Sequence, residues 1–336
     1  MIVTSRRSFV AGCVSTAAAG LGPAFRASAS YAPRPKLRLG VNLAGAEFKA
    51  IGGRWKWPQI ANLEYYLAKG FNVFRVPFKW ARLQPRQGGP LDEGAMQGLD
   101  RLVQTATRAG AIVLLDSHDY GRRDEVVIGT PGQSVTTTAF ADFWGRIARR
   151  YRDNRLVWFN LMNEPHDQDA QLNLQAQNAA CAAIRRAGAR SKVLFSGTSW
   201  TGARSWVKSG NASVMLGARD PANNYAFDVH QYLGKGHLKP EQVPGVGSHI
   251  LSTVYDWGRQ HGKKVFLGEF GVDLNPASHA EVAAMLTFMK DRTDVFLGAT
   301  YFAGGGTWGR NPNSSDPIDG VDKPHTIMMQ RMLRRQ

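Results

Sequence analysis

The stretch Leu156-Val-Trp-Phe-Asn-Leu-Met-Asn-Glu-Pro165 places one glutamate, Glu164, directly after a short apolar run. Later in the chain, Val265-Phe-Leu-Gly-Glu-Phe-Gly271 repeats the arrangement with Glu269. A continuous apolar run of this length is typical of a strand that is buried on both faces of a parallel sheet. Because the carboxyl ends of parallel strands lie at one edge, we expect the two carboxylates to lie close together.

The same theme recurs along the chain: a short run rich in Val, Ile, Leu and Phe, then polar residues, then a longer stretch with helical character. The eight apolar runs are 37–43, 73–78, 111–116, 156–161, 192–196, 226–230, 265–268 and 295–302. The helical stretches are 58–69, 93–109, 139–151, 172–187, 249–261 and 279–292. A chain of 336 residues that is 43% hydrophobic can bury one large core. The pattern predicts an α/β fold, a single-domain (β/α)8 TIM barrel.

A doubly wound sheet is the competing architecture, and it requires a glycine-rich phosphate loop after its first strand. That position here reads Gly40-Val-Asn-Leu-Ala-Gly-Ala46. The chain contains neither a G-x-G-x-x-G sequence in that context nor a Walker loop. We therefore favour the barrel.

The N-terminal residues differ in composition from the rest of the chain. The paired Arg6 and Arg7 precede an alanine- and glycine-rich stretch that ends in Ala27-Ser-Ala29. This order is typical of a twin-arginine export signal with a cleavage site after Ala29. We expect residues 1–29 to be a signal peptide and residues 30–336 to form the barrel domain, exported to the periplasm or the extracellular medium.

The net charge of +16 is high, but lysines and arginines are interspersed with acidic residues and form no long run. We interpret this charge as a solvated surface and expect no nucleic-acid partner. No apolar run reaches the length of a membrane-spanning helix. Beyond the expected signal peptide only Cys181 remains, which leaves no internal disulfide. We expect a monomer.

Polar and aromatic residues follow the predicted strands at the ends where a barrel carries its active site. Each of them alone is compatible with a structural role, but their repetition at the same end of successive strands indicates a functional site. They are Asn42, Arg75, His118, Asn163, Glu164, Trp200, His230, Tyr232, Glu269 and Trp308.

These residues, together with Val41-Asn-Leu-Ala-Gly-Ala-Glu-Phe48 and His230-Gln-Tyr-Leu233, resemble glycoside hydrolase family 5 over essentially the whole chain after the signal. The resemblance is strongest to the endo-β-1,4-glucanase branch of that family. It implies an acid/base residue after the fourth strand, Glu164, and a nucleophile after the seventh, Glu269.

The chemistry of a retaining glycosidase suits these residue types, because it needs one protonated and one ionised carboxyl group. Glu164 is the expected proton donor and Glu269 the expected nucleophile. Arg75 is expected to keep Glu269 ionised, and Tyr232 to donate a hydrogen bond to it. His230 is expected to lie near Glu164 and tune its protonation.

The remaining candidates are expected to contact the sugar. Asn163 is predicted to bind the 2-hydroxyl, and His118 either binds other hydroxyls or supports the neighbours of the nucleophile. Asn42 is predicted to bind substrate. Trp308 is predicted to lie beneath the sugar at the cleavage point and Trp200 to form a platform on the leaving-group side.

No spacing of histidines, cysteines and carboxylates predicts a metal site, and no cofactor is expected. The predicted activity is a secreted retaining endo-β-1,4-glucanase, a cellulase acting on β-glucan polysaccharide. A β-mannanase or a mixed-linkage or β-1,3-glucanase on the same frame is the alternative within the enzyme class. A non-catalytic polysaccharide-binding barrel or a basic adhesin is the alternative outside it.

Overall fold

The computed structural model describes residues 36–49, 51–234, 244–272 and 275–334. All of these residues belong to one compact unit, Pro35–Gln336. The predicted signal peptide, residues 1–29, lies outside the described residues.

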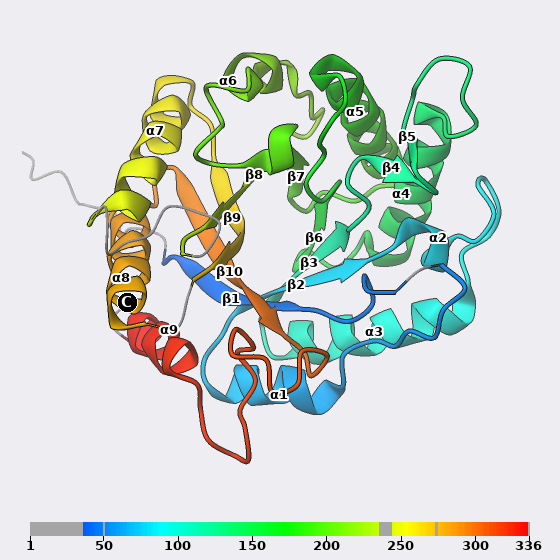
Figure 1. Ribbon diagram of the computed structural model, residues 1–336. Coiled ribbons are helices and arrows are strands. Elements are labelled where there is room, and N and C mark those ends of the chain that lie inside the picture. Colours follow the sequence, from blue (N-terminus) through cyan, green and yellow to red (C-terminus); the bar gives the residue numbers. More distant parts are fainter. Residues whose placement is uncertain (1–35, 50, 235–243, 273–274, 335–336) are drawn as a thin grey trace, which may run out of the picture. The chain divides into compact units, whose positions relative to one another are not determined.

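Eight parallel strands close into a barrel in the order β1-β10-β9-β8-β7-β6-β3-β2, which confirms the predicted fold. Figure 1 shows the closure, where blue β1 lies beside orange β10. The strands are β1 (Arg38–Leu43), β2 (Val73–Phe78), β3 (Ile112–Ser117), β6 (Val157–Asn160), β7 (Val193–Ser196), β8 (Tyr225–Tyr232), β9 (Val265–Gly271) and β10 (Phe296–Gly304). Each coincides with one of the predicted apolar runs, although β3, β8, β9 and β10 continue further at their carboxyl ends.

Helices surround the strands (Figure 1). The long ones are α1 (Ile60–Ala68), α3 (Glu93–Arg108), α4 (Thr137–Tyr151), α5 (Ala170–Arg186), α7 (Val246–Gln260), α8 (Pro276–Lys290) and α9 (Pro324–Arg334). The short elements are α2 (Trp80–Leu83), α6 (Asn211–Val214), a hairpin of β4 (Arg122–Arg123) with β5 (Val126–Val127), and the 3-10 turns η1 (Ser199–Thr201) and η2 (Met215–Gly217). These short elements and α9 were not predicted. Within the described residues, none of the helices combines the length and apolar character that crossing a membrane requires.

Side-chain caps fix where several helices begin. The side chains of Asp92, Thr136, Asp169 and Asn275 each accept a hydrogen bond from the backbone N–H three residues ahead. Such a bond satisfies one of the N–H groups that the first helical turn leaves without a partner. The loops that carry the site residues are therefore followed by helices α3, α4, α5 and α8 with defined starting points.

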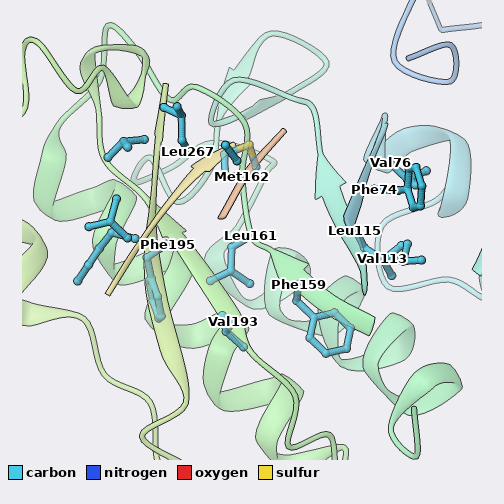
Figure 2. Close-up of a cluster of buried hydrophobic side chains, with 14 of the residues drawn as sticks. Phe74, Val76, Val113, Leu115, Phe159, Leu161, Met162, Val193, Phe195 and Leu267 are labelled. Carbon is cyan, nitrogen blue, oxygen red and sulfur yellow. The ribbon is translucent and has the colours of Figure 1, made fainter. Parts of the chain in front are cut away.

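Strand side chains alternate between the inside and the outside of the barrel wall, as a period of two requires. Figure 2 shows part of the buried outer set, including Phe74 and Val76 of β2 and Phe159 of β6. A separate inner cluster consists of Val73, Ile112, Leu114, Leu194, Ala226 and Phe266. The barrel interior is therefore filled by apolar side chains below the site.

A buried polar layer follows this inner cluster. Arg75, Asp116, Ser196 and Asp228 stand two residues after inner positions of β2, β3, β7 and β8, and all four are fully buried. Asn160 of β6 joins them, since its Nδ2 donates to Asp116 Oδ1 and to Asp228 Oδ2, both at 2.9 Å. Inward-facing positions of the strands are therefore apolar in the lower part of the barrel and polar in the layer just beneath the carboxyl ends. We call this layer the polar floor of the site.

Candidate active site

A cleft of about 570 Å³ lies over the carboxyl ends of the strands. It is lined by Phe48, His118, Tyr120, Glu164, Trp200, Gly202, Arg204, His230, Gln231, Tyr232, Glu269 and Phe302. Six of the residues predicted from the sequence are among them: His118, Glu164, Trp200, His230, Tyr232 and Glu269. Arg75, Asn42 and Asn163 are fully buried next to the cleft residues that they contact.

Glu269, on β9, is held from both sides of its carboxylate. Arg75 Nη1 donates to Glu269 Oε1 at 2.6 Å, and the Tyr232 hydroxyl donates to Oε2 at 2.6 Å. Burial would lower the pKa of Arg75, but the carboxylates of Asp116 and Glu269 raise it above its ordinary value. The guanidinium is therefore a permanent cation beside Glu269. Burial and the adjacent Glu269 raise the pKa of Tyr232, so its hydroxyl stays protonated as a donor.

Glu164 follows β6 and remains partly accessible, with 17% of its side chain exposed. Its backbone φ is +40°, in the left-handed region that side chains other than glycine rarely adopt. Local strain of this kind is found at functional sites, where the surrounding structure enforces it. The turn aims the carboxylate at His230, whose Nδ1 lies 2.7 Å from Glu164 Oε1.

His230 connects the two glutamates to the polar layer. Its Nδ1 is 2.7 Å from Glu164 Oε1 and 3.6 Å from Glu269 Oε2. Its Nε2 lies 3.2 Å from Asp228 Oδ2. The predicted proximity of His230 to Glu164 is thus present, and the ring also reaches Glu269.

His118 and Asn163 form the other side of the floor. Arg75 Nη2 donates to Asn163 Oδ1 at 2.7 Å, and Asn163 Nδ2 lies 3.3 Å from His118 Nε2. His118 Nδ1 contacts Asp116 Oδ2 at 2.8 Å. Burial lowers the pKa of His118 well below its ordinary value, so this imidazole is neutral.

The structure does not place Asn42, which was predicted to bind substrate, among the residues that line the cleft. Asn42 is fully buried, and its Nδ2 donates to the carbonyl oxygens of Gly268, Thr300 and Tyr301. Its Oδ1 accepts from Arg75 Nη1 at 2.8 Å. These contacts use the whole amide, so Asn42 ties β1 to β9 and β10 and orients Arg75.

Trp200 projects from the loop after β7 and is 50% exposed. Its ring stacks on His166, with the ring centres 4.7 Å apart and the planes 8° from parallel. Ser199, Trp200 and Thr201 all have φ between 46° and 55°, so a left-handed turn presents the indole to the cleft. Trp200, which was predicted to form a platform, thus lies in the cleft wall with its ring stacked on His166, a residue that was not predicted.

The structure places Phe302, rather than Trp308, in the cleft wall at the end of β10. Trp308 lies in the following loop and packs edge-on against Phe302, with ring centres 5.4 Å apart. Within the part of the chain that the structure describes, Trp308 is not a lining residue of this cleft. Phe302 is therefore the aromatic residue at the end of β10 that lines the cleft, and a contact of Trp308 with the sugar stays a prediction.

Other lining residues were also missed. Tyr120, Arg204 and Gln231 line the cleft, and Asp116 and Asp228 support it from below. Tyr120 is two residues after His118, and Gln231 directly follows His230. Their position at a strand end could therefore have identified both as candidate site residues. Asp116 and Asp228 precede those histidines by two residues, the spacing of one face of a strand.

Glu164, His230 and Glu269 also bring one possible metal ligand each to within 4.8 Å of one another. His230 is, however, hydrogen-bonded through both ring nitrogens, to Glu164 and to Asp228. A metal would have to displace one of these bonds to reach a nitrogen lone pair. We therefore interpret the three residues as a carboxylate pair linked by an imidazole.

The family model for cellulase, glycosyl hydrolase family 5, matches residues 40–305. The chain belongs to this family. Family 5 membership makes the protein a glycoside hydrolase. It confirms the family predicted from the sequence.

Curated relatives and solved structures place this family 5 enzyme among endoglucanases. It is 34% identical to endo-beta-1,4-glucanase B of Emericella nidulans over 309 residues, which covers 88% of this chain and 92% of the relative. It resembles the crystal structure of the endo-beta-1,4-glucanase Xac0029 from Xanthomonas axonopodis pv. citri, with a TM-score of 0.83, 34% identity and coverage of 89% and 99%. XacCel5A in complex with cellopentaose is similar, with a TM-score of 0.84, 35% identity and coverage of 88% and 99%.

Proposed function

We propose that this family 5 enzyme is a retaining endo-β-1,4-glucanase that hydrolyses internal bonds of cellulose-type β-glucans. The observation that carries the proposal is the distance between its two glutamates, since a carboxylate oxygen of Glu164 lies within 4.8 Å of one of Glu269. Retaining glycosidases place the two carboxyl groups about 5 to 5.5 Å apart, whereas inverting enzymes need about 6.5 to 9.5 Å to admit a water molecule.

In the first step, Glu269 attacks the anomeric carbon while Glu164 protonates the glycosidic oxygen, so that the carbon–oxygen bond to the leaving chain breaks. Arg75 and Tyr232 hold both oxygens of Glu269, at 2.6 Å each, which fixes the direction of attack. The carboxylate of Glu269 is therefore already oriented, and it loses little orientational freedom on reaching the transition state.

In the second step, Glu164 removes a proton from water, and the resulting hydroxide displaces Glu269 from the anomeric carbon. Asn163 supports both steps in this proposal. Its Oδ1 is held by Arg75 and one N–H of Nδ2 is directed at His118, and we assign the other N–H to the sugar 2-hydroxyl. That contact strengthens as positive charge develops on the ring.

The substrate assignment rests on the relatives and on the shape of the cleft. The named relatives are endo-beta-1,4-glucanases, and XacCel5A was solved with cellopentaose. The stacked Trp200 and His166 rings offer a flat apolar surface of the kind that binds the C–H face of a glucose unit. An open cleft with such a platform suits a polymer that is cut internally.

The twin-arginine sequence supports export of the enzyme to the periplasm or beyond, where a polysaccharide substrate is accessible. Replacing Arg6 and Arg7 by lysine is expected to leave the enzyme in the cell. Unchanged activity in the culture medium or periplasmic fraction of that variant would contradict the proposed route.

Reducing-sugar release from carboxymethyl cellulose, mannan, laminarin and a mixed-linkage β-glucan tests the substrate. We expect the β-1,4-glucans to be cleaved with retention of the anomeric configuration, as followed by NMR of the first products. Activity confined to mannan or to laminarin would reject the substrate assignment.

The Glu269→Gln variant tests the nucleophile. We expect its kcat to be lower by on the order of 10⁴-fold or more, while its binding of cellopentaose stays close to that of the wild type. A wild-type protein that binds cellopentaose without hydrolysing any β-glucan would indicate a non-catalytic barrel.

A further inference from the structure

Two Asp-x-His segments lie opposite each other in the polar floor. Asp116 and His118 stand at the end of β3, and Asp228 and His230 stand in β8. In each segment the aspartate contacts the histidine two residues later, at 2.8 Å and 3.2 Å. Asn160 Nδ2 joins the two aspartates with bonds of 2.9 Å. Two Asp–His pairs of the same spacing are thus joined through the side-chain amide of Asn160.

The surroundings of His118 require a neutral ring. Its Nδ1 faces Asp116 Oδ2, an acceptor, so this nitrogen carries a proton. Its Nε2 faces two groups that can donate, Asn163 Nδ2 and the hydroxyl of Tyr120, both at 3.3 Å. An Nε2 that accepts from these donors carries no proton, and burial, which lowers the pKa of His118, acts in the same direction.

The surroundings of His230 require the opposite protonation. Its Nδ1 faces Glu164 Oε1 at 2.7 Å and Glu269 Oε2 at 3.6 Å, while its Nε2 faces Asp228 Oδ2 at 3.2 Å. Ionised carboxylates are acceptors only, so both ring nitrogens donate whenever Glu164 is ionised, as it is before it acts as the base. We propose that Asp228 is a positioning residue that keeps His230 doubly protonated, as a fixed cation shared by the two glutamates. This inference rests on the catalytic roles proposed above for Glu164 and Glu269.

The structure makes room for the carboxyl group of Asp228 beside Gly268. A Cβ on Gly268 would lie 2.1 Å from Asp228 Oδ1, so only glycine fits immediately before Glu269. Burial would raise the pKa of Asp228, but the His230 cation and the hydrogen bond between them lower it below its ordinary value. Burial also opposes the charge on His230, yet Glu269 and Asp228 raise its pKa to about 10. Each charge of the pair therefore stabilises the other.

The other charged groups around His230 support this assignment. Asp228 contacts it from its own strand β8, Glu269 from β9 and Glu164 from the loop after β6. Arg75 of β2 is the permanent cation on the far side of Glu269, where it is paired with both Asp116 and Glu269. Three carboxylates thus contact His230 directly, while the nearby guanidinium is already shared by two.

A fixed cation at this point acts on Glu164 in the second step. Glu164 is ionised in the glycosyl-enzyme, in which Glu269 is esterified, and it takes a proton from water as Glu269 is released. Oxygens of the two side chains lie within 4.8 Å of each other. The hydrogen bond from His230 to Glu164 also stabilises the ionised form that acts as base in the second step. Asp228 therefore acts on the reaction through His230 without contact with the substrate.

The test compares the wild type with Asp228→Asn, which removes the charge and preserves the shape of the side chain. Two-dimensional ¹⁵N–¹H NMR of the imidazoles reports which nitrogens of each of the 8 histidines carry protons, and a His230→Gln variant assigns the signal. In the wild type we expect His230 to stay doubly protonated from about pH 5 to about pH 9 and His118 to be singly protonated. In Asp228→Asn we expect the pKa of His230 to fall below its wild-type value, so that the ring loses its second proton at a lower pH.

The kinetic readout is the pH profile of kcat on a β-glucan. Above the new pKa of His230, Asp228→Asn should lose activity by about ten- to hundredfold relative to the wild type, the cost of losing a charged hydrogen bond. Ser196→Ala is the matched control: Ser196 Oγ lies 3.5 Å from the same Asp228 oxygen but carries no charge, so His230 should remain doubly protonated.

Two results would overturn the inference. One is a His230 that is neutral at pH 7 in the wild type, a measurement that does not require the variant to fold. The other is an Asp228→Asn protein in which His230 keeps both protons, or loses one without any change in the pH profile. Absence of glucanase activity in the wild type would instead refute the proposed function, and the NMR result would still report on the Asp228–His230 pair.

Discussion

Arg75 Nη1 lies 2.6 Å from Glu269 Oε1, although 194 residues separate the two in the chain. The same guanidinium bonds Asn42, Asn163 and Asp116. One side chain therefore orients the proposed nucleophile and the amide beside the proposed acid. Its fixed, planar set of donors is what allows it to meet several acceptors at once.

Arg75→Lys keeps the charge but loses this geometry, so we expect a fall in kcat of about 10²-fold or more and a loss of about 3 to 5 kcal/mol of stability, because buried acceptors lose their partner. Kinetics on soluble β-glucan and thermal unfolding measure the two effects. Near-normal kcat with a folded protein would show that charge alone is sufficient beside Glu269.

Glu164→Gln should separate the acid role from the nucleophile role. Cellulose-type substrates have a poor leaving group, so we expect kcat to fall by about 10² to 10⁴-fold. An aryl cellobioside with an acidic phenol needs little protonation to leave, so its first step should be nearly unaffected and the glycosyl-enzyme should accumulate. Burst kinetics and mass spectrometry detect that intermediate. An equal loss on both substrates would contradict the assignment of Glu164 as proton donor.

Trp200→Ala should weaken the binding of long oligosaccharides. The indole is 50% exposed and stacked on His166, so its removal costs a sugar contact but no core packing. We expect KM for cellopentaose to rise about tenfold with little change for a short aryl substrate. Val207→Ala is the control, since Val207 is 54% exposed and does not line the described cleft. Equal effects of the two changes would contradict the platform.

Glu47 makes stability depend on pH. It is buried, Gly45 N donates to its Oε2, and its Oε1 has no hydrogen-bond partner among the described residues. Burial raises its pKa from 4.5 to about 7. The folded state therefore binds a proton more tightly than the unfolded state, and the resulting stabilisation is complete below pH 4.5 and is lost as the pH rises to about 7.

Glu47→Gln mimics the protonated form, so it should raise stability by about 1 to 3 kcal/mol at pH 8 and leave it nearly unchanged at pH 4.5. Thermal unfolding at the two pH values measures this. Glu281→Gln is the matched control. Both Glu281 oxygens accept backbone N–H bonds, from Gly245 and Gly247, so that change should destabilise the protein at pH 8. A Glu47→Gln protein that is less stable at pH 8 would contradict the argument.

Several parts of the molecule were predictable because the signal is local. The apolar runs 73–78 and 192–196 correspond to β2 (Val73–Phe78) and β7 (Val193–Ser196), since a strand buried on both faces needs a continuous apolar sequence. Helix α9 (Pro324–Arg334) was missed because it follows a loop-rich segment and, among the described residues, is not part of a strand–helix–strand repeat.

The sequence by itself determined the barrel and the pair Glu164 and Glu269, because strand periodicity and the position of polar residues at strand ends are properties of neighbouring residues. Only the tertiary structure decided that Asn42 is structural, that Phe302 rather than Trp308 lines the cleft, and that Asp228 contacts His230 beneath the site. These outcomes depend on which strands are neighbours and how far each side chain reaches across the barrel. Closure of the barrel creates those contacts, and no local stretch of sequence encodes them.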